Sequence, residues 1–200
     1  MKIKVFSDTI CGWCYIGHTR LLKVLEVFKN KSFIFEHVPF QLNPDMPKQG
    51  ISRQDYLKYK FGSKDAAETM YRNMVEEAQK ENLKFNLEKI QITPNTNFSH
   101  ILTKFAFSKN IGHEVLSKIF DAYFTKGENI GDIEVLVKIG QSCNIKKKEI
   151  YDLFLSNNEI KEINKSDVIA RSKGINGVPF FEINNKTYIS GAQSTANLIE

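Results

Sequence analysis

Two of the three cysteines of this chain, Cys11 and Cys14, lie two residues apart in the stretch SDTICGWCYIG, which spans residues 7–17. A predicted strand over 2–7 precedes the pair, and a predicted helix over 14–28 follows it. The two sulfur atoms lie on one helix face, because residues three apart do so. A Cys-x-x-Cys pair at such a turn is typical of thiol–disulfide exchange, in which Cys11 attacks a disulfide and Cys14 resolves the mixed disulfide.

A zinc clamp and a structural disulfide are the alternative roles for this pair. Zinc needs about four ligands, and the chain offers only Cys143 and four scattered histidines besides the pair, so we expect no metal. Permanent disulfides are rare in the cytosol. The first ten residues contain Asp8 and stop being apolar too early for a signal-peptide core. We therefore expect a cytoplasmic protein with a redox-active pair, and we expect Cys143 to pack in the core.

The charge balance gives no sign of a nucleic-acid partner. The net charge is +5, from 28 basic and 23 acidic residues that are spread along the chain. The densest basic cluster, residues 146–148, is followed at once by Glu149, which is typical of a solvated helix start. No apolar run is long enough to span a bilayer. We therefore expect neither nucleic acid nor a membrane as a partner.

A helical pattern occupies the middle of the chain. A second strand is predicted over 33–40, and residues 41–50, with two prolines, are predicted to be a connector. Nearly every segment from 52 to 173 then has helical periodicity. The predicted N-cap residues are Ser63, Asp132, and Asn95 or Asn97. One predicted helix face carries Ala67, Met70, Met74 and Ala78, and the strongest apolar stripe consists of Val115, Leu116, Ile119, Phe120, Tyr123 and Phe124.

The C-terminal part returns to strands. The last long helix is predicted over 158–173, and strands over 180–183 and 187–190 flank a hairpin turn at 184–186. A short helix is predicted over 192–199. Without the helical block, this order of elements is that of thioredoxin.

We therefore predict an α/β protein with a thioredoxin fold and an all-helical insertion. Residues 1–48 and 165–200 are predicted to form the thioredoxin-like domain, and residues 49–164 the insertion. The chain is long enough for one domain of this kind to bury a substantial core.

Five motifs together resemble one family. They are CGWCYIG from Cys11, PNTNFSH from Pro94, GENIGD from Gly127, GINGVPFFEIN from Gly174 and ISGAQ from Ile189. In this order, and over nearly the whole chain, they resemble the DsbA-family oxidoreductases. The resemblance is to the FrnE-like branch, which is related to 2-hydroxychromene-2-carboxylate isomerases and kappa-class glutathione transferases.

The resemblance implies roles for the residues around the pair. Cys11 would be the nucleophile and Cys14 the resolving thiol, with Gly12 and Trp13 between them in the active-site loop. A second loop would bring Val178 and Pro179 to the site, with a cis bond before Pro179. The backbone of Val178 would then face the sulfur and pair with an extended peptide or glutathione.

The motif PNTNFSH leaves two readings open. In the family this stretch lies near the active site, so Asn95 and His100 would contact substrate. In the other reading, Asn95 caps a helix and His100 lies on its surface.

Two departures from relatives favour dithiol chemistry. Many relatives have proline at the position of Gly12, and the isomerase and transferase relatives have serine at the position of Cys11. Trp13 carries no positive charge to stabilise a thiolate, so a milder oxidant than a periplasmic oxidase is expected. We predict a cytoplasmic thiol–disulfide oxidoreductase, a monomer or homodimer, that acts by exchange, reduction or isomerisation on protein or small-molecule disulfides and thiols. No tightly bound cofactor is expected, and glutathione is a candidate co-substrate.

Two other functions remain open. One is a glutathione-dependent isomerase or transferase that uses a single thiol. The other is a non-catalytic binding protein that holds clients in a groove between the subdomains.

Overall fold

A four-stranded mixed sheet forms the centre of the molecule. The computed structural model describes residues 1–199, with the backbone alone at Lys64. The strand order is β2-β1-β5-β6, in which β1 pairs with β2 in parallel and the other pairs are antiparallel. The strands are β1 (Lys2–Ser7), β2 (Ile34–Pro39), β5 (Phe180–Ile183) and β6 (Thr187–Ser190).

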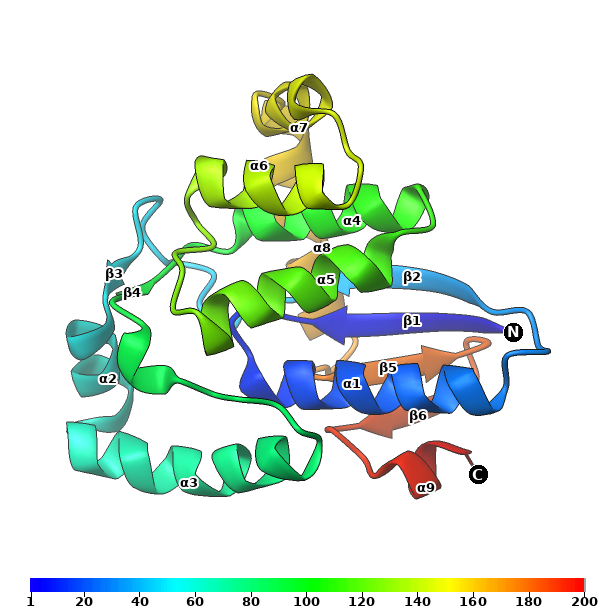
Figure 1. Cartoon of the computed structure of the whole chain (residues 1–200), viewed down its shortest axis with the longest axis horizontal. Helices are drawn as coiled ribbons and strands as arrows, with labels where there is room; N and C mark the ends of the chain where they lie inside the picture. The colour runs from blue at the N-terminus through cyan, green and yellow to red at the C-terminus, as the bar shows by residue number, and fades with distance from the viewer. Residues whose placement is uncertain (200) are drawn as a thin grey trace.

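Helices cover both faces of this sheet (Figure 1). In the view of Figure 1, α1 and α9 lie in front of the sheet and α8 lies behind it. The remaining helices form a block that extends beyond the end of the sheet at which α1 begins and above the β2 edge. The helices are α1 (Gly12–Val27), α2 (Arg53–Phe61), α3 (Lys64–Lys80), α4 (Asn97–Ser108), α5 (Gly112–Phe120), α6 (Ile133–Ser142), α7 (Lys147–Phe154), α8 (Asn157–Ser172) and α9 (Thr195–Ile199).

Strand β1 buries both of its faces, as a central strand between two helical layers must. Ile3 and Val5 pack with Leu21 of α1, whereas Phe6 points to the other side and packs with Ala170 of α8. The alternation follows from the two-residue period of a strand. The sheet thus holds α1, and with it the cysteine pair, in a fixed place.

The helical block has a core of its own, and its strongest predicted stripe is confirmed. All six stripe residues are buried. They lie on α5 and on the π-helical turn η2 (Asp121–Thr125) that continues it. Ser63 and Asp132 cap α3 and α6 as predicted, each accepting a backbone hydrogen bond. Gly127 follows η2 with a φ of +74°, a conformation that favours glycine.

Two local predictions for this block are wrong. A two-stranded antiparallel ladder, β3 (Ile51–Ser52) and β4 (Ile92–Thr93), interrupts the segment predicted to be helical, and a 3₁₀ turn η1 (Leu87–Lys89) lies beside it. The β-branched pair in β4 is followed by Pro94, a combination that disfavours helix. Met70 is 66% exposed, because α3 packs only through the face that carries Ala67, Met74 and Ala78.

The order of elements confirms the predicted α/β fold with a block of helices between β2 and β5. The exact division at 48/49 and 164/165 stays a prediction, and α8 runs without a break through the second of these points. Within residues 1–199, no helix has both the length and the apolar character needed to cross a membrane.

Candidate active site

Cys11 is the N-cap residue of α1, and this position fixes the direction of its sulfur atom. The backbone of Cys11 is extended, with φ −94° and ψ 113°, and its Sγ accepts a hydrogen bond from the backbone N–H of Cys14 at 3.3 Å. The N–H of Cys11 donates to the carbonyl of Asp8 at 3.1 Å. The first turn of α1 therefore holds both cysteines together, as free thiols, at the positive end of the helix dipole.

Cys14 is the more deeply buried thiol of the pair. Its exposed fraction is 1%, against 7% for Cys11. Burial raises the pKa of the Cys14 thiol well above its ordinary value, and the adjacent Cys11 sulfur raises it further. The backbone of Asp8 and the hydroxyl of Ser7 oppose this rise through hydrogen bonds. Cys14 therefore remains protonated in the reduced protein at neutral pH.

A loop from the far end of the chain faces the Cys11 sulfur. The peptide bond between Val178 and Pro179 is cis. The Cys11 thiol donates a weak hydrogen bond to the Val178 carbonyl, with 3.6 Å between sulfur and oxygen. Trp13 and this loop line a groove of about 360 Å³. The other residues that line this groove are Gly177, Ser190, Gly191 and Ala192.

Two glycines of α1 allow its neighbours to approach closely. A Cβ atom at Gly12 would lie 2.4 Å from Sδ of Met74 on α3. A Cβ atom at Gly17 would lie 2.9 Å from Cγ of Pro179. The helix that carries the cysteines is therefore packed tightly against α3 and against the cis-proline loop.

His100 does not lie on the surface of α4, so that part of the second reading is wrong. It is fully buried, with Nε2 3.3 Å from Oδ1 of Asp8 and Nδ1 3.4 Å from Nε2 of His37. Asp8 is also fully buried and accepts a hydrogen bond from the backbone N–H of Leu42 at 2.7 Å. Because α4 packs against β2, His100 lies beneath the loop that carries the cysteines.

Asn95 directly precedes Thr96, which is the N-cap residue of α4, so the prediction of Asn95 or Asn97 as the N-cap residue is wrong. The Oδ1 atom of Asn95 accepts a hydrogen bond from the N–H of Asn97 at 2.9 Å, and its Nδ2 donates to the carbonyl of Met46 at 2.8 Å. Asn95 therefore satisfies the start of α4 and ties it to the connector after β2. A contact of Asn95 or His100 with substrate stays a prediction.

Sequence reasoning missed Ser7 and Asp8 as parts of the site. Both are buried directly before the cysteine loop, and both influence the Cys14 thiol. Two polar residues at the end of an apolar strand were the available signal, since buried polar groups need hydrogen-bond partners.

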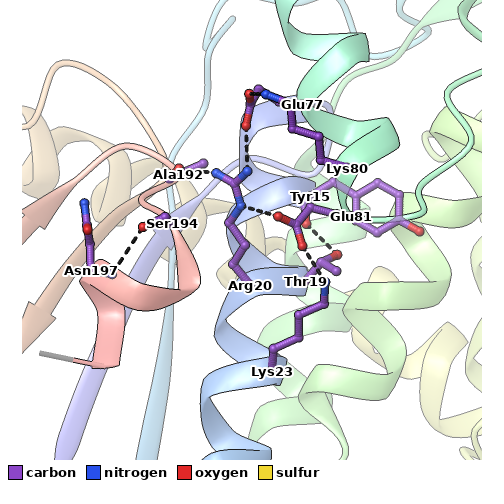
Figure 2. A network of polar contacts seen from close by, with 10 residues as sticks. All are labelled: Tyr15, Thr19, Arg20, Lys23, Glu77, Lys80, Glu81, Ala192, Ser194 and Asn197. Carbon is purple, nitrogen blue, oxygen red and sulfur yellow. Dashed lines mark hydrogen bonds and ion pairs between the residues drawn. The ribbon is translucent and has the colours of Figure 1, made fainter.

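Arg20 joins three parts of the structure around the groove (Figure 2). Its guanidinium donates to Glu77 at 2.7 Å and to Glu81 at 2.6 Å, both on α3, and to the carbonyl of Ala192 at 2.7 Å. Lys23 and Lys80 pair with the same two carboxylates. Because Ala192 lines the groove, this network fixes α3 and one groove wall to the helix that carries the cysteines.

The four histidines of the chain form two pairs of neighbouring rings, one beside α1 and one beside β2. His18 and His113 have centroids 5.5 Å apart, and His37 and His100 have centroids 5.6 Å apart. Burial, and then the neighbouring His113, lower the pKa of His18 to about 3, and burial lowers that of His113 to about 4. Within the described part of the chain, no group of three or more acidic, histidine or cysteine side chains has the arrangement of a metal site.

Comparisons with known proteins agree with this fold. YwbO of Bacillus subtilis (strain 168), an uncharacterized protein, is 28% identical over 146 residues, which are 72% of this chain and 67% of YwbO. The crystal structure of SCO1869, a probable DsbA oxidoreductase from Streptomyces coelicolor, matches with a TM-score of 0.87 and 24% identity, over 100% of this chain and 87% of that chain. The cytosolic disulfide reductase DsbM from Pseudomonas aeruginosa, solved with GSH, matches with a TM-score of 0.70 and 15% identity, over 95% and 90% of the two chains.

The family assignment rests on a match over almost the whole length. The model of the DSBA-like thioredoxin domain matches residues 2–200. This range includes the cysteine pair, the helical block and the cis-proline loop. The chain therefore belongs to the family of DSBA-like thioredoxin domains.

Proposed function

We propose that this protein is a thiol–disulfide oxidoreductase that works through the Cys11–Cys14 dithiol. The observation that supports this most directly is the position of the Cys11 sulfur. It lies at the N-terminus of α1, where it accepts a hydrogen bond from the N–H of Cys14. It also faces the carbonyl of Val178, beside the groove that Trp13 and the cis-proline loop line. The sulfur atom lies at the positive end of the helix dipole and is placed to meet a substrate.

The exchange proceeds in two balanced steps when the reduced protein acts on a disulfide. The Cys11 thiolate attacks one sulfur of the substrate, a mixed disulfide forms, and the other substrate sulfur leaves as a thiolate that takes up a proton. Cys14 then loses its proton and attacks the Cys11 sulfur, which releases the second substrate thiol. Two electrons pass from the dithiol to the substrate, and the reverse sequence oxidises a dithiol substrate.

The different burial of the two thiols supports this division of roles. Cys11 is the more exposed sulfur, and burial keeps Cys14 protonated until its partner is engaged. An extended segment of a protein, or glutathione, would lie in the groove and pair with the backbone of Val178. Glutathione is thus a candidate co-substrate, and no tightly bound cofactor is needed.

Single cysteine variants test this mechanism. Cys11→Ser should abolish turnover of a model disulfide. Cys14→Ser should accumulate a mixed disulfide on Cys11, visible by intact mass. Cys143→Ser is the matched control, because this third thiol lies at the end of α6, outside the groove. Full turnover by Cys14→Ser would contradict the two-cysteine mechanism.

A glutathione-dependent reaction with Cys11 alone is the second candidate. The fold that this chain shares with DsbM, which was solved with GSH, favours glutathione as a ligand. In this case Cys14→Ser keeps activity, and the activity depends on added glutathione. The two cysteines of CGWC favour the dithiol reaction over this one.

We also propose that the protein works in the cytoplasm. Its fold is shared with a protein described as a cytosolic disulfide reductase. Cell fractionation followed by rapid thiol alkylation would test this, because the pair should then be recovered mostly as thiols from the cytoplasmic fraction.

A further inference from the structure

A second group of polar side chains near Cys11 comes from α2 and α3. Tyr71 of α3 lies one turn before Met74, which contacts Gly12. Burial raises the pKa of Tyr71, Arg53 opposes this rise, and a Cys11 thiolate adds to it. Tyr71 and Trp13 also pack against one cluster, which consists of Ile16, Met74 and Ala78, so Tyr71 lies on the side of α3 that faces the cysteine loop.

Arg53 is held against Tyr71 without an anionic partner. Its guanidinium carbon lies 5.4 Å from the ring centroids of both Tyr56 and Tyr71. Its Nη1 donates to Oγ1 of Thr93 at 3.4 Å. Among the described side chains, no carboxylate forms an ion pair with Arg53, and its buried Nε has no acceptor. A guanidinium in such a setting has donors left to bind a carboxylate.

Arg53 and Tyr71 both line a cavity large enough for a small molecule. The cavity has a volume of about 1270 Å³ and lies between α2, α3 and residues 87–91. Its apolar wall consists of Leu57, Val75, Leu87 and Ile90. Three glutamates, at positions 68, 76 and 88, and two further cations, Lys58 and Arg72, also line it, but all five are exposed, where solvent and salt screen their charge. An anion would therefore be held by Arg53 itself rather than by the overall charge of the cavity.

We propose that Arg53 binds a carboxylate of the substrate, so that this protein prefers small disulfides that carry a carboxylate close to the sulfur atoms. This inference rests on the proposed function. The carboxylate takes no part in the exchange. It places the scissile sulfur near Cys11 while Tyr71 and Tyr56 hold the guanidinium in position. Glutathione disulfide belongs to this chemical class.

The test uses three symmetrical disulfides that differ in charge. They are 3,3′-dithiodipropionate, which is anionic, bis(2-hydroxyethyl) disulfide, which is neutral, and cystamine, which is cationic. The reduced full-length protein reacts with each in a single turnover, and thiols are quenched with an alkylating agent and counted by intact mass. Intrinsic reactivity cancels when each rate constant of a variant is divided by that of the unmodified protein.

Arg53→Gln should slow the reaction with the anionic disulfide at least about tenfold more than the reaction with the neutral one, the size expected for losing one charge-assisted hydrogen bond. The cationic disulfide should gain relative to the neutral one. Arg53→Lys, which keeps the charge, should retain part of the anionic preference. Lys84→Gln is the control, because it removes a charge from an exposed position. Its rate constants, divided by those of the unmodified protein, should be equal for the three disulfides.

The outcomes separate the inference from the function on which it rests. Equal losses with all three disulfides in Arg53→Gln, or no loss with any, would overturn the role of Arg53 and leave the dithiol function intact. If Arg53→Gln is poorly folded, Arg53→Lys provides the test instead. A well-folded Arg53→Lys that has lost the preference for the anionic disulfide would overturn the role of the Arg53 charge. If the unmodified protein reacts with none of the disulfides, the proposed function fails, and this inference fails with it.

Discussion

Mild acid should destabilise this fold, and three buried histidines, His18, His37 and His113, set the size of the effect. Burial, with a contribution from His100, lowers the pKa of His37 well below its ordinary value. Burial, with a contribution from His113, lowers the pKa of His18 to about 3, and burial lowers that of His113 to about 4. An unfolded histidine has a pKa of about 6.5. Between these values the unfolded chain binds more protons than the folded protein. The free energy of unfolding therefore falls as the pH drops below about 6.5, and the loss levels off near the folded pKa values.

The expected loss is large for a single domain. Each histidine contributes about 1.4 kcal/mol for each pH unit within this window. From pH 7 to pH 5 the free energy of unfolding should fall by about 2 kcal/mol for each ring, and so by about 4 kcal/mol for His18 and His113 together. His37, whose pKa is also lowered, adds a further loss. The total stability of a domain is only about 5–15 kcal/mol. The hydrogen bond from Lys80 lowers the pKa of Glu77, so this carboxylate titrates below the window.

The variant His113→Leu isolates the contribution of His113 to this loss. Neither ring nitrogen of His113 has a hydrogen-bond partner among the described residues, and the ring packs against Phe35 and Phe107 at centroid distances of 4.5 and 5.0 Å. His113→Leu should therefore be at least as stable as the unmodified protein at pH 7. Its free energy of unfolding should fall by about 2 kcal/mol less than that of the unmodified protein between pH 7 and pH 5.

Urea unfolding at pH 7, 6 and 5, followed by the fluorescence of Trp13, measures this directly. His113→Gln, which is polar but does not titrate, should flatten the pH dependence equally without a gain at pH 7. The reasoning is refuted if the unmodified protein is equally stable at all three values, or if both variants keep the full slope.

Three further predictions concern packing and pairing around the site. Gly17→Ala should lower the free energy of unfolding by about 1–3 kcal/mol, because its Cβ would meet Pro179. Gly177→Ala should cause no such loss, because the space around Gly177 is open. Equal losses for the two variants in denaturant titrations would contradict this. Arg20→Ala should lower the free energy of unfolding by about 3 kcal/mol, since the Arg20 side chain is 9% exposed and paired. Lys23→Ala should lower it by less than about 1 kcal/mol, because the Lys23 side chain is 47% exposed. A reversed order would argue against the network around Arg20. Asp132→Ala should cost about 1 kcal/mol through the lost cap of α6, and an unchanged melting temperature would count against that cap.

Local sequence signals predicted the central elements well. The period of two in β1 and the apolar steps in α5 each have a strong local cause, and the structure confirms both. The cysteine pair was found in the same way, because its spacing carries the chemistry. The turn at Asn184 and Asn185 was also legible, since both residues adopt positive φ angles that asparagine tolerates.

The features that sequence did not reveal depend on contacts between distant segments. Asp8 and His100 are 92 positions apart in the numbering and meet only because α4 packs against β2. Arg20 lies on a helix whose pattern shows no reason to bury a charge, and its partners come from α3. Arg53 likewise meets Tyr71 only through the packing of α2 on α3. The sequence pattern of a single segment therefore does not predict these pairings.

The reduction potential of the Cys11–Cys14 pair tests the central claim most directly. The full-length protein would be equilibrated in graded glutathione buffers, its thiols trapped by alkylation, and its intact mass read. The dithiol mechanism predicts a reversible two-electron transition between two thiols and one Cys11–Cys14 disulfide, with a midpoint well below the value of about −120 mV for DsbA. If no such disulfide forms, or if Cys11 carries only a stable glutathione adduct at every ratio, the dithiol account is wrong and the single-thiol reaction takes its place.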